Sequence, residues 1–356
     1  MHNLETLLKK SIILPVFLIL CLFFQGCAGT PLKPVFYPGE PDPPRYQYLK
    51  SIYNASDISN SSLKKAFAEG LFSFQKAFGI TAYKNTLLTT DTKQRGYAVL
   101  NFDTGDLQFI NQDTSNRHSQ MQMPLGITVD QQGNRFIADR QAHRVLMFSS
   151  SESYIKSFDF VATDSSPTAV AVVDSKLYVT QLKQSRIDVI DIESGKLLES
   201  FKEGAQLAWP YDLVAHGEML YVTDLLRYQI IQLSQSGQYQ KSFGDIGDTT
   251  GNLSRPKGIA IDKQGRMLVV DSAFENFQIF RKDGQLLGYV SKGGDAPEDL
   301  YLPAGICISY DLASYFQKYA APGFKLEYIV AIANQAGPSK INVYGFGKMD
   351  GATYQD

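Results

Sequence analysis

Hydrophobic and polar positions alternate along the chain in a block of about 45 residues that recurs six times. Each copy opens with an apolar residue, two further residues, a proline and then a run rich in Ile, Val and Ala. A turn, a second apolar run, a third run and a weaker fourth run follow. The prolines stand at 124, 167, 210, 256 and 303, and the earliest copy begins with Phe78-Gly79-Ile80 without a proline.

Four short strands per unit, separated by turn residues, are typical of a β-propeller blade. The run after each proline predicts the innermost strand, because a strand covered on both faces by neighbours is almost continuously apolar. We therefore expect an all-β fold, a six-bladed β-propeller over residues 62–348. Residues 349–356 are expected to form a C-terminal tail.

The sixth copy has little chain after Phe346 for a fourth strand. Residues 46–61 precede the first copy, and Tyr46–Ile52 alternate in the way a strand does. We predict that this N-terminal strand pairs onto the last blade and closes the ring, with the rest of 46–61 as a lead-in. Closure of this kind leaves no long unpaired edge between the first and last blades.

Blade six also contains an insertion over residues 309–328. Leu312, Tyr315, Phe316 and Tyr319 lie three or four residues apart, which predicts one face of a short helix. This aromatic face either covers the edge of the blade or docks a partner, and packing is the commoner role.

The repeats resemble NHL repeats. The copy that runs from Pro256–Asp262 through Val269–Ser272 to Phe277–Phe280 follows that family's pattern, and the second copy supplies His143-Arg144-Val145. The resemblance covers residues 62–348 and implies six blades of the NHL type. It also implies, for lipoproteins with a Pro-rich leader, a role in assembling envelope or multihaem cytochrome complexes. That association is an analogy at the level of the fold.

The first residues predict export. Lys9 and Lys10 precede an apolar run, Ile12–Phe24, whose 13 residues are too few to span a bilayer but fit a signal peptide. Gly26-Cys27 resembles a bacterial lipobox, so we expect residues 1–26 to be a lipoprotein signal peptide and Cys27 to be acylated. The alternative is a plain signal peptide with Cys27 as an idle thiol.

A lipidated Cys27 would place the protein in the cell envelope as a membrane-anchored chain. Ala28 after the cysteine indicates the outer membrane under the sorting rules of the resembling class, with the periplasmic or surface side left open. Six prolines within residues 31–44 predict that residues 27–45 form a semi-extended stalk reaching about 40 Å.

Composition narrows the classes of function. Processing removes Cys21 and acylates Cys27, which leaves Cys307 and no intramolecular disulfide. Removal of residues 1–26 takes away one acid and two lysines, so the net charge changes from −2 to −3. The chain therefore has no cluster of basic residues of the kind that would predict nucleic-acid binding. No CxxCH motif is present for a c-type haem. We expect a monomeric propeller with a protein partner.

Residues that could carry chemistry have simpler structural explanations. Asp91, Asp139, Asp224 and Asp271 recur once per blade and are expected to accept hydrogen bonds from turn amides or to pair with a neighbouring Arg, rather than to bind metal. His118, His143 and His216 are too few and too scattered for a zinc site. Cys307 lies in a predicted innermost strand among apolar neighbours, as a core cysteine does.

The most unusual cluster lies where blades four and five begin. Trp209, Tyr211 and Asp212 stand at one entrance, and Arg255 and Lys257 stand at the equivalent positions of the next. An aromatic pair, an acid and two cations near the channel predict a binding rim. The alternative is an ordinary rim of salt bridges.

The sequence favours a protein-binding scaffold over an enzyme, with no catalytic residue, metal ligand or cofactor expected. One alternative is a hydrolase or lyase with calcium in the central channel, which needs converging acids of which Asp212 is one. Another is a glycan- or peptidoglycan-binding module that uses exposed Tyr residues.

Overall fold

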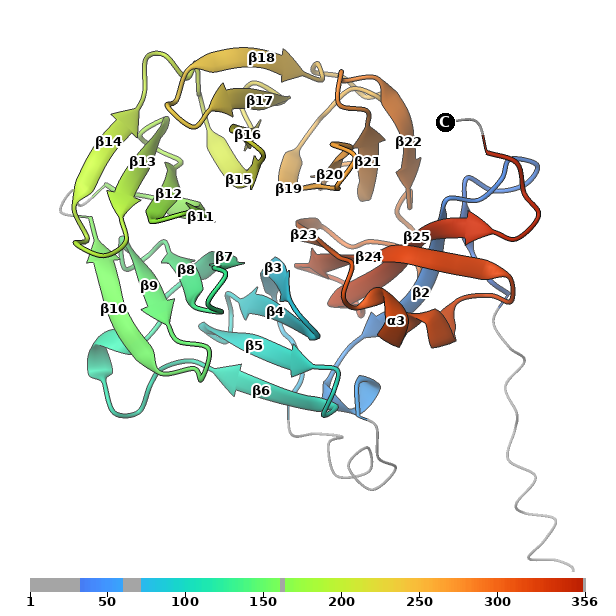
Figure 1. Cartoon of the computed structure of the whole chain (residues 1–356), viewed down its shortest axis with the longest axis horizontal. Coiled ribbons are helices and arrows are strands. Elements are labelled where there is room, and N and C mark those ends of the chain that lie inside the picture. Colours follow the sequence, from blue (N-terminus) through green and yellow to red (C-terminus); the bar gives the residue numbers. More distant parts are fainter. Residues whose placement is uncertain (1–32, 60–71, 161–163, 355–356) are drawn as a thin grey trace, which may run out of the picture. The chain divides into compact units, whose positions relative to one another are not determined.

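A computed structural model describes residues 33–59, 72–160 and 164–354, and within these residues the chain forms six antiparallel sheets arranged in a ring (Figure 1). Each innermost strand contacts the innermost strand of the next sheet, and the last contacts the first. The predicted all-β, six-bladed propeller is confirmed. No helix among the described residues is long and apolar enough to span a bilayer.

The blades follow one another along the chain, each built from four consecutive strands up to blade five. Blade one contains β3 (Ala77–Tyr83), β4 (Thr86–Asp91), β5 (Gly96–Asn101) and β6 (Asp106–Ile110). Blade two contains β7 (Pro124–Val129), β8 (Arg135–Asp139), β9 (Arg144–Phe148) and β10 (Tyr154–Asp159). Blade three contains β11 (Pro167–Val173), β12 (Lys176–Gln181), β13 (Arg186–Asp191) and β14 (Leu197–Phe201).

Blade four contains β15 (Pro210–His216), β16 (Met219–Asp224), β17 (Gln229–Ser234) and β18 (Tyr239–Phe243). Blade five contains β19 (Pro256–Ile261), β20 (Met267–Asp271), β21 (Asn276–Phe280) and β22 (Leu286–Val290). Blade six contains β23 (Pro303–Ser309), β24 (Phe324–Asn334) and β25 (Ile341–Met349), and it is completed by β1 (Phe36–Tyr37) and β2 (Tyr46–Ile52). Two single 3-10 turns, Ala55–Asp57 and Arg117–Ser119, lie between strands.

Glycine near the start of an innermost strand lets adjacent blades approach closely. A Cβ at Gly305 of β23 would lie 2.4 Å from the carbonyl oxygen of Phe78 in β3, and one at Gly258 would lie 2.6 Å from that of Ala304. Such separations are well inside van der Waals contact, so only glycine fits there. This close approach keeps the central channel narrow.

The N-terminal strand occupies the place that the sequence indicates for it. β2 pairs antiparallel with β25, from Tyr46 opposite Phe346 to Ile52 opposite Ile341. Blade six is thus built from segments that come from the two ends of the described chain (Figure 1). The tail adds to this joint, because the hydroxyl of Tyr354 donates to the carbonyl of Pro44.

The stalk expected over residues 27–45 is corrected from Val35 onward. Phe36 and Tyr37 form β1 against β2, and their rings pack edge to face on Phe324 and Tyr344, with centroids 5.5 and 6.4 Å away. Burial of two aromatic rings outweighs the tendency of the surrounding prolines to keep the segment extended and solvated. The expected signal peptide and Cys27 lie outside the described residues.

The insertion in blade six packs against the body of the propeller. It contains α3 (Ala313–Phe316) and η3 (Gln317–Tyr319), and it ends before Phe324, where β24 begins, so the expected range of 309–328 is too long. Leu312 and Phe316 are fully buried, and the ring of Tyr315 lies 4.8 Å from that of Phe102 in blade one. The insertion therefore covers the joint between blades six and one.

Candidate functional site

Two aromatic rings narrow the central channel at the end where the innermost strands begin, which we call the entrance face. Phe78 of β3 and Tyr211 of β15 come from opposite blades, and their ring centroids lie 6.1 Å apart. Their backbones and those of neighbouring innermost strands enclose a cavity of about 40 Å³. Pockets for small molecules are on the order of 300–1,000 Å³, so this cavity has no room for a substrate.

Asp212 stands where four of the other innermost strands carry glycine, and it leans toward blade five. One carboxylate oxygen accepts a hydrogen bond from the backbone N–H of Ile259 at 2.9 Å, and the other accepts from Leu213 at 2.9 Å. Removal from bulk water raises the pKa of this carboxyl to about 6, although both N–H groups oppose the rise. Asp212 therefore joins blades four and five through backbone donors.

The cavity does not have the ligand set of a calcium site. Calcium takes six to eight oxygen ligands, several of them carboxylates. Among the described residues that line the cavity, Asp212 is the one acid, and its oxygens already accept backbone hydrogen bonds. No group of three or more His, Cys, Asp or Glu residues in the described part of the chain could hold a metal.

Lys257 is a largely buried residue whose ammonium group has no partner among the described residues. The residue is only 6% exposed, and its Nζ lies 6.0 Å from the centroid of the Tyr211 ring. The described residues supply neither a hydrogen bond nor an ion pair to this ammonium. Burial lowers the pKa of Lys257 to about 8, with further lowering by the charges of Arg255 and Lys76.

Cations from three blades surround this end of the channel. Lys76 comes from blade one, Arg140 from blade two, and Arg255 and Lys257 from blade five. The pKa of the Tyr211 hydroxyl is raised, mainly by burial and then by the Asp212 charge, and the charges of Arg140 and Arg255 act against this rise. None of the four cations has an ion-pair partner in the described residues.

Apolar side chains lie on the same face beside blade four. Trp209 is 45% exposed and Leu226 is 48% exposed. The two segments are adjacent, because the N–H of Leu225 donates to the carbonyl of Trp209 at 3.0 Å. Exposed aromatic and aliphatic side chains next to cations are the composition of many protein-binding surfaces.

The recurring blade acids hold turns together, as expected from their positions. Asp271 accepts hydrogen bonds from the amides of Ser254 and Arg255 before β19 and from those of Ala273 and Phe274 after β20. Asp91, Asp139 and Asp224 accept from the corresponding amides of their own blades. Their structural role is confirmed.

Blades three and six perform the same function with amides. Gln181 accepts from Ser166, and Asn334 accepts from Tyr301.

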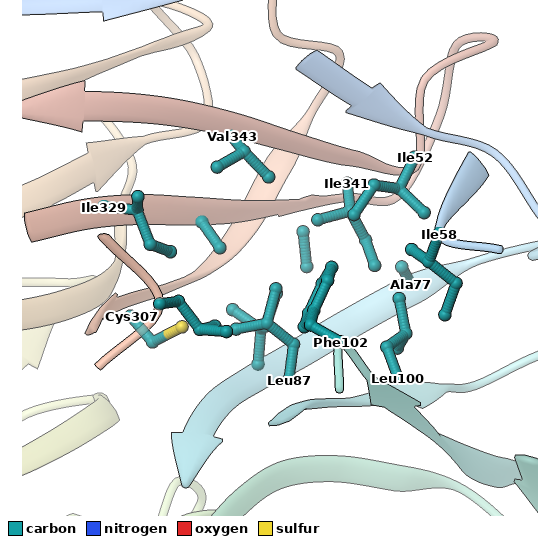
Figure 2. Packing of buried hydrophobic residues seen from close by; sticks show 14 of the residues in the cluster. Ile52, Ile58, Ala77, Leu87, Leu100, Phe102, Cys307, Ile329, Ile341 and Val343 are labelled. Atoms are coloured by element: carbon teal, nitrogen blue, oxygen red, sulfur yellow. The ribbon is translucent and has the colours of Figure 1, made fainter. Parts of the chain in front are cut away.

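The thiol of Cys307 lies in the apolar cluster between blades six and one (Figure 2), and burial raises its pKa to about 12. This is the behaviour of a core cysteine and not of a nucleophile.

A second hollow, which we call the polar groove, lies between blades one and two, with a volume of about 540 Å³. Its lining combines one aromatic ring, Tyr83, with amide, hydroxyl and carboxylate groups such as those of Asn85, Asn101 and Gln108. At its base Arg135 pairs with Glu152 at 2.7 Å. Nothing in the sequence pattern singles out this groove, because its residues come from strands and turns of two different copies.

The structure brings together Tyr211, Asp212, Arg255 and Lys257 at the entrance face, with Trp209 at its margin. Sequence reasoning missed Phe78, Lys76, Arg140 and Leu226. Phe78 could have been found, since it follows the first residue of an innermost strand as Tyr211 does. Lys76 and Arg140 lie in turns whose convergence depends on closure of the ring.

Comparison with known proteins supports the propeller fold and gives no finer assignment. No family model matches the chain. Among curated proteins, Protein lin-41 of Caenorhabditis elegans is 44% identical over 46 residues, which make up 13% of this chain and 4% of that protein. The match thus concerns a segment of one repeat's length.

Solved structures resemble nearly the whole propeller. An auxiliary nutrient binding protein from Bacteroides thetaiotaomicron has a TM-score of 0.60 at 10% identity, over 84% of this chain and 75% of that chain. A gluconolactonase from Xanthomonas campestris has a TM-score of 0.57 at 14% identity, over 88% and 97%. Virginiamycin B lyase from Staphylococcus aureus has a TM-score of 0.51 at 14% identity, over 76% and 85%. At such low identity these likenesses show the propeller fold alone.

Proposed function

We propose that this protein is an envelope lipoprotein that presents an NHL-type propeller as a protein-binding scaffold. The observation that carries the proposal is the entrance face, where the chain's single Trp is 45% exposed beside Leu226, above a channel with no room for a substrate. Trp is enriched at protein interfaces and at binding hot spots.

Attachment through Cys27 would hold the propeller at a membrane. The lipobox-like Gly26-Cys27 and the apolar run before it support this placement, and Ala28 supports the outer membrane. Multihaem cytochrome complexes, which the NHL-lipoprotein resemblance implies, are one class of partner for such a scaffold.

Capture from native membranes tests the scaffold. The tagged full-length protein is solubilised in detergent beside two variants, Trp209→Ala and Tyr289→Ala. Tyr289 is also 45% exposed but lies on β22, the outermost strand of blade five, so it is a matched control. We expect the wild type and Tyr289→Ala to recover a stoichiometric partner. Trp209→Ala should recover at least tenfold less of that partner. Equal recovery from all three proteins contradicts the assignment of the face.

A glycan-binding module is the second candidate, and the polar groove favours it. Sugar recognition uses amide and carboxylate groups that hydrogen-bond hydroxyls, together with an aromatic ring for stacking, and Tyr83 with Asn85, Asn101 and Gln108 provides this combination. Sedimentation with purified peptidoglycan tests it. Binding that Tyr83→Ala abolishes and Trp209→Ala leaves intact would favour this function over the scaffold.

Calcium-dependent hydrolysis or elimination has less support from the residues. The cavity contributes one carboxylate, and Asp212 uses both of its oxygens to join two blades. We therefore assign no catalytic step to the channel.

A further inference from the structure

We propose that the mouth of the channel on the entrance face is an anion site that receives a carboxylate side chain from an acidic segment of the partner protein. This inference rests on the proposed scaffold function and adds the chemistry of the partner. It is carried by one buried cation, by the three cations around it and by the apolar margin formed by Trp209 and Leu226.

Burial of an ammonium group without a counter-charge is unfavourable, and proteins normally pair such groups. Lys257 is 6% exposed, and its Nζ faces the ring of Tyr211 rather than an acceptor. The acid whose charge acts on Lys257 is Asp271, which forms no ion pair with it and accepts hydrogen bonds from four backbone amides. The position is therefore arranged for an anion that comes from outside the chain.

Neighbouring charges strengthen the case for an anion. Arg255 and Lys76 are exposed and Arg140 is half-buried, and all three act electrostatically on Lys257 or Tyr211. Asp212 forms no ion pair with them, and its carboxylate accepts hydrogen bonds from backbone N–H groups of blades four and five. Four cations from three blades thus stand at this end without an ion pair to any described acid, so the site can receive a negative group.

The surroundings favour a carboxylate on a protein over an extended polyanion. Trp209 and Leu226 offer apolar contact beside the cations, which suits a peptide with acidic and apolar side chains. Glu275 and Asp164 lie at the same end of blades five and three, where they would repel a long nucleic-acid strand. The positive region is limited to the channel mouth.

Fluorescence anisotropy with a dye-labelled hexaglutamate peptide tests the site in the full-length protein in detergent. Hexalysine and hexathymidylate with the same dye are the comparison probes. We expect saturable binding of hexaglutamate that weakens as NaCl rises from about 50 to 500 mM. Lys257→Met should weaken it at least tenfold, Lys257→Arg should restore it to within about threefold, and Lys93→Met, an exposed lysine of blade one, should leave it unchanged.

Equal affinity of the wild type and Lys257→Met for hexaglutamate would overturn the inference, provided that both proteins show the same circular dichroism spectrum. Tighter binding of hexathymidylate than of hexaglutamate would overturn the choice of a carboxylate.

Membrane capture separates the two proposals. A partner that depends on Trp209 but not on Lys257 or salt refutes the anion site and leaves the scaffold intact, whereas hexaglutamate binding with no captured partner refutes the scaffold alone.

Discussion

Replacement of Lys257 by methionine should make the protein more stable. The side chains have similar length, so packing is retained, while the unpaired charge is removed. The pKa of Lys257 falls from its ordinary value of 10.5 to about 8 in the folded protein, and one pKa unit corresponds to about 1.4 kcal/mol. We expect the free energy of unfolding at pH 7 to rise by about 3 kcal/mol.

The sign of the pH dependence follows from the same shift. At pH 7 the lysine is protonated in both states, and the folded state bears the full cost of burying the charge. Between about pH 8 and 10.5 the unfolded chain holds the proton more tightly than the folded chain, so wild-type stability rises with pH. The advantage of Lys257→Met over the wild type should therefore shrink from pH 8 upward.

Urea titrations at pH 7, 9 and 10, followed by Trp209 fluorescence and by circular dichroism, measure the difference in free energy of unfolding between Lys257→Met and the wild type. Lys93→Met, at an exposed position on the same face, should change stability by less than about 0.5 kcal/mol. Destabilisation of more than about 1 kcal/mol by Lys257→Met at pH 7 would refute the reasoning, because it would mean that the ammonium has a stabilising partner in the folded chain.

Replacing Asp271 by alanine leaves four backbone amides without their acceptor, so we expect a loss of about 2–4 kcal/mol in urea titrations. Asp283→Ala breaks an ion pair whose side chains are about half exposed and should cost far less than Asp271→Ala; equal losses would contradict the turn-holding role. Gly305→Ala places a Cβ 2.4 Å from a carbonyl oxygen of β3 and should cost about 1–3 kcal/mol, while Gly39→Ala, which meets nothing within 4 Å, should be neutral. The pKa of Asp212, about 6 in the folded state, lies above its unfolded value of about 3.9. Wild-type stability should therefore contain a component that falls as pH rises from about 4 to 6, and Asp212→Asn should lack it; identical pH profiles of the two proteins would refute the shift.

The fold could be predicted because each repeat contains local sequence patterns that identify its strands. Prolines 124, 167, 210, 256 and 303 each stand at the first residue of an innermost strand, where no ladder hydrogen bond requires an N–H. The apolar runs after them are long enough to identify strands covered on both faces. The recurrence itself predicted the number of blades.

The β1 strand could not be predicted in the same way. Phe36 and Tyr37 lie among prolines, and local propensity there favours an extended, solvated chain. Their pairing with β2 depends on aromatic contacts with Phe324 and Tyr344, which are about 290–310 residues away in sequence. Tertiary contacts at such separation leave no periodic signal in the segment itself.

The candidate site was predictable in part. Trp209, Tyr211, Asp212, Arg255 and Lys257 stood out because they depart from the repeat at equivalent positions. Only when six sheets close into a ring do Lys76 and Arg140 lie at the same end of the channel as Lys257, whose ammonium group has no partner among the described residues.

Site-specific photo-crosslinking in living cells tests the central claim most directly. A photoreactive amino acid is placed at position 226 on the entrance face, or at position 287 on the outer strand of blade five, where Leu226 and Leu287 are 48% and 51% exposed. A scaffold that binds through the entrance face predicts a discrete protein adduct from position 226 and none from position 287. Adducts of equal yield from both positions, or from neither, would contradict it.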